Sequence, residues 1–143
     1  KVGKVVKIMV LVHARGLPVA VTTGSASPHE SKLVQGLFEF MLSSDTPERI
    51  IGDKAYDSDA LDEDLDDECI EMVAPHRKNR KPQNVTQDAR KLRRYRRRWT
   101  VERTISWFQN FRRLCIRYEK STMLFQGFLH LGCSIILLKQ VLG

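Results

Sequence analysis

Two carboxylates occupy positions where a carboxylate could do chemistry. Asp53 ends a short apolar strand expected over residues 49–53, and open α/β sheets place reactive groups at strand ends. Glu102 lies in the most basic stretch of the chain. Taken singly, Asp53 fits a surface turn and Glu102 fits an ion pair with Arg98. A carboxylate on a core-packed helix near the end of a strand needs a cation, and hard oxygen ligands suit Mg²⁺ or Mn²⁺.

Other polar side chains share the helical spacing of Glu102. Tyr95, Arg98, Glu102 and Gln109 are separated by three, four and seven residues, so a helix would place them on one face. This face would carry a phenol, a guanidinium, a carboxylate and an amide. The neighbouring face is apolar and suits the core.

Charge is distributed unevenly along the chain. The net charge is +7, but residues 76–120 alone hold sixteen Lys or Arg against three acidic residues, whereas residues 53–71 hold ten acidic residues and one Lys. A basic block that contains aromatic residues indicates a polyanionic partner, with nucleic acid first; a solvated basic helix is the competing interpretation. The candidates for contacts with backbone phosphates are Lys54, Lys78, Arg80, Lys81, Arg112 and Arg113.

The patterns predict an α/β class with a mixed sheet in a single domain over residues 1–143. The expected elements, in chain order, are strand 5–12, turn 15–18, strand 19–23, an amphipathic helix capped at Ser27 that continues to Met41, strand 49–53, acidic helix 58–68, strand 70–74, basic loop 76–83, a long basic helix over about 86–118 and an apolar helix over about 121–142. Strand 5–12 is nearly continuously apolar, which is typical of burial on both faces. In the last helix, Leu124, Phe128, Leu131, Ile135 and Leu138 mark the apolar spacing.

Composition excludes several classes of protein. A chain of 143 residues with 42% hydrophobic and 29% charged residues matches one ordinary soluble domain rather than a disordered or disulfide-bonded one. The three cysteines form no Cys-x-x-Cys pair, so they predict reduced thiols in a cytoplasmic protein rather than a zinc ribbon. The apolar run 128–138 is short and interrupted, so no membrane span is expected.

The two candidate carboxylates lie in motifs that resemble a known family. Residues 52–58 (GDKAYDS) and 95–103 (YRRRWTVER) are similar to the bacterial insertion-sequence transposases that carry an Asp-Asp-Glu (DDE) triad. Residues 12–18 and 111–120 also resemble segments of that family. The resemblance extends over essentially the whole chain.

This resemblance implies a ribonuclease H-like fold, as in retroviral integrases, and a catalytic role in DNA transposition. Asp53 matches the second Asp of the triad and Glu102 the Glu. Such carboxylates hold Mg²⁺ or Mn²⁺ for cleavage of a DNA phosphodiester and for strand transfer. Tyr95 and Arg98 match the Tyr and Arg of the family's Y-x-x-R-x-x-x-E motif, which is associated with gripping phosphate near the transposon end. Gln109 stands where the family has a basic residue.

One expected residue of the triad is not in the sequence. The first Asp belongs on the first strand of the fold, and no Asp precedes Asp45. We therefore expect a catalytic domain that lacks its first strand, and the reading frame upstream of Lys1 would show whether that Asp exists. Without it, the chain would be an inactive, non-catalytic remnant that binds DNA through its basic helix. Resemblance also implies a homodimer acting on paired transposon ends in the bacterial cytoplasm.

Overall fold

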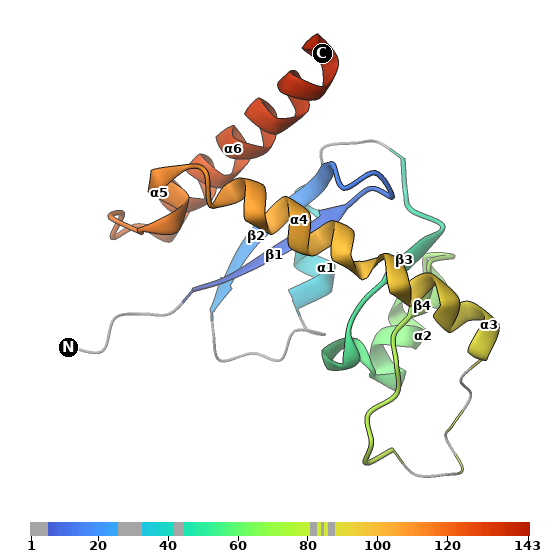
Figure 1. Ribbon diagram of the computed structural model, residues 1–143. Helices are drawn as coiled ribbons and strands as arrows, with labels where there is room; N and C mark the ends of the chain where they lie inside the picture. The colour runs from blue at the N-terminus through green and yellow to red at the C-terminus, as the bar shows by residue number, and fades with distance from the viewer. Residues whose placement is uncertain (1–5, 26–32, 42–44, 81–82, 84, 86–87) are drawn as a thin grey trace. The chain divides into compact units, whose positions relative to one another are not determined.

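The computed structural model describes residues 6–25, 33–41, 45–80, 83, 85 and 88–143. The chain divides into two compact units. We call residues 6–25, 33–41 and 100–143 the hairpin unit, and the described residues of 45–99 the parallel-strand unit. Each unit is described by itself below, with the elements labelled in Figure 1.

The hairpin unit begins with two antiparallel strands, as the sequence predicted. Strand β1 (Val6–Val12) pairs with β2 (Pro18–Ser25), and the register shifts between Leu11 and Val12. The turn between them closes through hydrogen bonds from His13 N to Leu17 O (2.8 Å) and from Gly16 N to His13 O (2.7 Å). Burial of β1 on both faces was a wrong prediction. Ile8 is 40% exposed and Met9 is buried, because one face of the hairpin carries the packing.

Helix α6 (Thr122–Leu142) supplies most of the core of the hairpin unit. It packs against β2, and α5 (Arg112–Cys115) packs against it. The predicted apolar helix over 121–142 is confirmed, but a different face is buried: Leu124, Leu131 and Leu138 are exposed. The buried core cluster consists of Val21, Phe108, Phe125, Leu129, Cys133 and Ile136.

Two further points concern the helices of the hairpin unit. Helix α1 (Val34–Phe38) packs against both strands, and its predicted start at Ser27 lies outside the described residues. By length and composition, α6 would also fit a membrane span, which the interrupted apolar run did not predict. Mostly buried core helices of soluble proteins pass the same test, whereas 22% of the apolar window of α6 is buried, on the face that joins the core cluster.

The parallel-strand unit is built around one strand–helix–strand motif. Strand β3 (Arg49–Ile51) runs parallel to β4 (Glu71–Val73), with Ile50 opposite Met72. The connection is α2 (Asp59–Asp67), whose buried Leu61 and Leu65 face inward. A parallel pair needs a crossover of this kind, so the predicted strands and acidic helix are confirmed, with strand bounds trimmed at their ends.

The strands form two separate sheets in the described residues, β1–β2 and β3–β4. The α/β class is therefore confirmed, whereas the single mixed sheet is not what these residues form. Each pair is closed by local connections, a tight turn in one case and one helix in the other.

The long helix predicted over 86–118 is divided into shorter elements. They are α3 (Ala89–Leu92), the 3₁₀ helix η4 (Arg93–Arg98), α4 (Trp99–Phe108) and α5. Five arginines within residues 93–98 place like charges three and four residues apart, which destabilises an α-helix. At the other end, Gln109 and Asn110 follow α4, and Asn is a poor helix former. Phe111 then adopts an extended backbone and packs against the core cluster.

Candidate active site and nucleic-acid interface

Asp53 lies in a tight turn directly after β3. It is the N-cap of the 3₁₀ helix η2 (Lys54–Tyr56), and its Oδ1 accepts a hydrogen bond from Ala55 N at 2.9 Å. Capping of this kind fixes the direction of a short side chain. The Asp53 side chain is exposed, so its carboxylate is open to a ligand.

Gly52 brings this turn close against β4. Its N–H donates to Val73 O at 3.1 Å, which extends the parallel ladder by one residue. A Cβ at Gly52 would lie 2.5 Å from Met72 Cε and 2.7 Å from Tyr56 Cδ2. The Gly of the GDKAYDS motif therefore serves close packing at the position before the carboxylate.

The loop after β4 contacts the Asp53 turn through Arg77. Arg77 Nε donates to Lys54 O at 3.0 Å, and Nη2 donates to Ala55 O at 2.9 Å. Arg77 was not among the residues predicted from the sequence. The signal that could have found it is topological, because loops that follow adjacent parallel strands meet at one edge of a sheet.

Asp57 is the buried centre of the same pair of loops. Its side chain is 4% exposed, and it accepts hydrogen bonds from Arg77 N (2.7 Å), from His76 Nδ1 (2.8 Å) and from Arg80 Nη1. Burial alone would raise the pKa of Asp57, but the Arg77 and His76 hydrogen bonds and the positive charge of Arg80 outweigh it and lower the pKa. Asp57 is therefore a structural carboxylate rather than part of a solvated acidic face.

Arg80 is held inside this network. Its guanidinium pairs with both Asp57 and Asp59, and its side chain is 12% exposed. Charge alone predicts a phosphate contact for Arg80. Because its donors are engaged by two carboxylates, it is better described as the residue that ties the loop after β4 to the start of α2.

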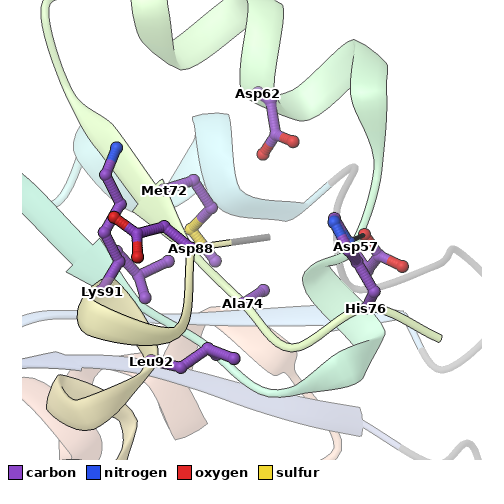
Figure 2. Close-up of a pocket in the computed structure, with 9 residues that line it drawn as sticks. Asp57, Asp62, Met72, Ala74, His76, Asp88, Lys91 and Leu92 are labelled. Carbon is purple, nitrogen blue, oxygen red and sulfur yellow. Dashed lines mark hydrogen bonds and ion pairs between the residues drawn. The ribbon is translucent and has the colours of Figure 1, made fainter. Parts of the chain in front are cut away.

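A small pocket of about 140 Å³ lies beside this network within the parallel-strand unit. Figure 2 shows Asp57 and His76 at one end and Asp88, Lys91 and Leu92 at the other. Partial desolvation raises the pKa of Asp62, an exposed residue that also lines the pocket. In the part of the chain that the structure describes, His76 Nε2 is buried and has no hydrogen-bond partner.

The predicted pair Tyr95 and Arg98 is brought together in η4. The Arg98 guanidinium carbon lies 5.5 Å from the centroid of the Tyr95 ring, a cation–π geometry. Residues three apart are eclipsed in a 3₁₀ helix, so the division of the helix preserves this contact. Element η4 also packs against β3, the strand that leads to Asp53.

Glu71 ties the strands of this unit to the basic helical segment. On β4 it pairs with Arg49 of β3 and with Lys91 of α3, the latter at 2.5 Å between Oε1 and Nζ. The hydrogen bonds from Lys91 and Arg49 lower the pKa of Glu71. Tyr95 and Arg98 therefore follow a helix that is itself anchored to the sheet.

Glu102 lies in the first turn of α4, in the hairpin unit, and is exposed. The two residues after it fix α4 to the turn of the hairpin. Arg103 Nη2 donates to Arg15 O, and the buried Thr104 hydroxyl lies within hydrogen-bonding distance of the carbonyl oxygens of Gly16 and Thr100. The resemblance of residues 12–18 to the transposase family thus corresponds to the surface on which α4 rests.

The other basic candidates differ in their surroundings. Lys54, Lys78 and Arg112 are exposed. Arg113 is also exposed, and it pairs with Glu119 at 2.8 Å and lies over the rings of Tyr118 and Phe128. Lys81 lies outside the described residues. Gln109 is exposed, and its backbone carbonyl oxygen accepts a hydrogen bond from the Cys115 thiol.

Two of the carboxylates have the chemistry of ligands for a divalent cation. Asp53 and Glu102 are both exposed oxygen donors, the type that Mg²⁺ and Mn²⁺ prefer. They belong to different units, and the described residues contain no group of three His, Cys, Asp or Glu side chains that could hold a metal ion. By the type of their donor atoms, the two residues are therefore suited to be two of the ligands of a Mg²⁺ or Mn²⁺ ion.

Comparison with known families identifies the chain. The model of the transposase DDE domain family matches residues 3–137, so the chain belongs to the family of transposase DDE domains. Members of this family generally use divalent metal ions.

A curated relative supports the same assignment. The chain is 38% identical over 90 residues to a candidate transposase of insertion sequence element IS402 from Burkholderia cepacia. The match covers 63% of this chain and 38% of the relative, so the chain spans well under half of that protein. No solved structure matches the chain at a significant level.

Proposed function

We propose that this domain takes part in metal-dependent cleavage and strand transfer of DNA, with Asp53 and Glu102 as two of its carboxylate ligands. The observation that carries the proposal is the Asp53 turn. In a chain of the transposase DDE domain family, the GDKAYDS motif forms a rigid cap that holds an exposed carboxylate at the end of a parallel strand.

The fold we propose is ribonuclease H-like. The proposal is supported by the order of elements along the chain, an antiparallel hairpin, then a helix, then two parallel strands joined by a helix; the described strands themselves lie in two separate sheets. The family match supports this reading.

The residues of this chain would have different roles in the proposed reaction. Asp53 and Glu102 would hold Mg²⁺ or Mn²⁺, which, when bound, activates a water or a 3′ hydroxyl and stabilises the leaving oxygen. Arg98 would bind a backbone phosphate with its guanidinium fork, and the Tyr95 ring beside it would restrict its orientation. The exposed Lys54, Lys78 and Arg112 would add affinity without sequence preference.

A second function is compatible with the chain as given. No Asp precedes Asp45, so a complete Asp-Asp-Glu triad is not contained in these 143 residues. A basic module that binds DNA without cutting it would explain the charge between residues 76 and 120. Only the catalytic proposal implies a homodimer that acts on paired transposon ends in the cytoplasm; the DNA-binding alternative does not require one.

The experiment compares cleavage with binding. In the transposase reading frame that contains this chain, we expect Glu102→Gln and Asp53→Asn to abolish Mn²⁺-dependent cleavage of labelled DNA while salt-sensitive DNA binding persists. Glu63→Gln, an exposed carboxylate on α2, is the matched control and should cut normally. Unchanged cleavage in the Glu102 or Asp53 variant would overturn the assignment, and binding without any cleavage in the parent protein would favour the binding module.

A further inference from the structure

The peptide group between Lys54 and Ala55 connects a cation to the candidate metal ligand. Its carbonyl oxygen accepts a hydrogen bond from Arg77 Nε at 3.0 Å, and its N–H donates to Asp53 Oδ1 at 2.9 Å. A positive group at the oxygen end of a peptide polarises it and strengthens its N–H as a donor. The guanidinium of Arg77 and the carboxylate of Asp53 therefore act on the two ends of one rigid plane.

Arg77 is itself held at more than one point. Its Nη2 also donates to Ala55 O at 2.9 Å, so the guanidinium fork grips two consecutive carbonyl groups of the turn. Its backbone N–H donates to Asp57 Oδ2 at 2.7 Å. Since Asp57 follows the turn in sequence, the turn is clamped from both of its ends by one residue of the neighbouring loop.

We infer that Arg77 is a positioning residue for Asp53: it fixes the Lys54–Ala55 peptide, and that peptide fixes the Asp53 carboxylate for a divalent cation. The inference rests on the proposed function of Asp53. It assigns a role to a loop residue that neither charge nor spacing distinguished from its basic neighbours.

The chemistry of the fork decides which substitution is informative. A guanidinium can donate to two carbonyl oxygens at once in a fixed geometry, whereas an ammonium is a compact point charge. Arg77→Lys keeps the positive charge but cannot make the paired hydrogen bonds. Arg77→Gln removes the charge as well as the paired hydrogen bonds. A role as a simple phosphate contact predicts that the Lys variant behaves like the parent, because Lys also binds phosphate as a point charge.

The test uses the transposase reading frame that contains this chain and two readouts apart from activity. Hydrogen exchange of a peptide covering residues 53–57, measured without metal, reports on the Ala55 N–H. Titration with Mn²⁺ alone, without DNA, reports on the Asp53 carboxylate as a metal ligand. We expect both Arg77 variants to speed exchange and to weaken Mn²⁺ binding by about 10-fold, a usual effect of removing a group that orients a metal ligand.

Control variants separate this inference from the function on which it rests. Asn79→Ala, in the same loop and exposed, should leave exchange and Mn²⁺ affinity unchanged, and Arg77→Lys should leave DNA affinity at fixed salt unchanged. If Asp53→Asn weakens Mn²⁺ binding but both Arg77 variants bind as the parent does, the positioning role is wrong and the proposed function survives. If Asp53→Asn binds Mn²⁺ as the parent does, the ligand assignment fails and the inference fails with it.

Discussion

The hydroxyl of Thr104 on α4 meets the carbonyl oxygen of Gly16 in the hairpin turn, 88 positions earlier in the chain. Thr104 is fully buried, and its neighbour Arg103 donates to Arg15 O. Two successive residues of α4 thus bind two successive carbonyl groups of the turn. Because Glu102 directly precedes them, this junction fixes the part of the helix that carries the candidate catalytic carboxylate.

Replacing Thr104 by Val should destabilise the hairpin unit. The variant keeps the shape of the side chain but leaves the Gly16 carbonyl without its donor, and an unsatisfied buried polar group costs about 1–3 kcal/mol. Urea unfolding of the parent and the variant measures the difference in free energy. Ser106→Ala, on the exposed face of the same helix, should change it little; equal losses in the two variants would argue against the junction.

Gly16 should be sensitive to substitution, whereas Gly127 should not. Its φ of +84° is strained for any other residue, and a Cβ there would overlap with Arg103 Nη2. We expect Gly16→Ala to lower the free energy of unfolding by about 1–2 kcal/mol or more. Gly127→Ala in α6, where a Cβ meets open space, should instead raise it by up to about 1 kcal/mol. Changes of the same sign in both variants would contradict this account.

Asp57→Asn should destabilise the parallel-strand unit most strongly near neutral pH. The Asn side chain cannot accept from His76, Arg77 and Arg80 together, and breaking a buried ion pair costs about 3–5 kcal/mol. The folded-state pKa of Asp57 lies below its ordinary value of 3.8, so its contribution is fully present above that value. It is lost as the pH falls through the lowered pKa.

The pH dependence gives this prediction its check. The gap in urea midpoint between the parent and Asp57→Asn should be present at about pH 5 and above and shrink towards pH 3. Asp67→Asn, at the exposed end of α2, serves as the control. A gap that does not change with pH would mean that the charge of Asp57 is not what stabilises the loops.

Arg98→Ala should weaken DNA binding and lower its dependence on salt. Removing one cation that binds a phosphate reduces the slope of log affinity against log salt by about 1. Arg98→Lys should retain the slope although its ammonium cannot stack on the Tyr95 ring as the guanidinium does. Binding isotherms at several salt concentrations measure this, and a slope equal to that of the parent in Arg98→Ala would show that Arg98 has a structural role.

Local signals predicted most of the secondary structure. Turn residues and β-branched runs located the hairpin, and Leu61 and Leu65 located the inner face of α2. Which face of α6 is buried could not be predicted, because the helix is apolar nearly all round and periodicity then selects no face. The core contains Phe125 and Leu129 rather than their neighbours Leu124 and Phe128.

The candidate site was predictable only as isolated motifs. The motifs named Asp53, Glu102, Tyr95 and Arg98, and the structure adds what holds them. The partners of the Asp53 turn come from residues 76–80, about twenty positions away. Nothing in composition or spacing separates Arg77, whose guanidinium donates to the turn, from its neighbour Lys78, and both residues are exposed. That distinction depends on the pairing of β3 with β4.

The contact between the loops after β3 and β4 in the parallel-strand unit has a consequence for recombination between transposase sequences. Residues 53–57 and 76–80 share hydrogen bonds through Asp57, Arg77 and Arg80, so we expect each loop to depend on the other for its shape. A chimera that receives the GDKAYDS segment alone would carry the carboxylate without its support. Recombination between related elements should therefore tolerate crossovers after residue 80 or before residue 49 far better than crossovers within α2.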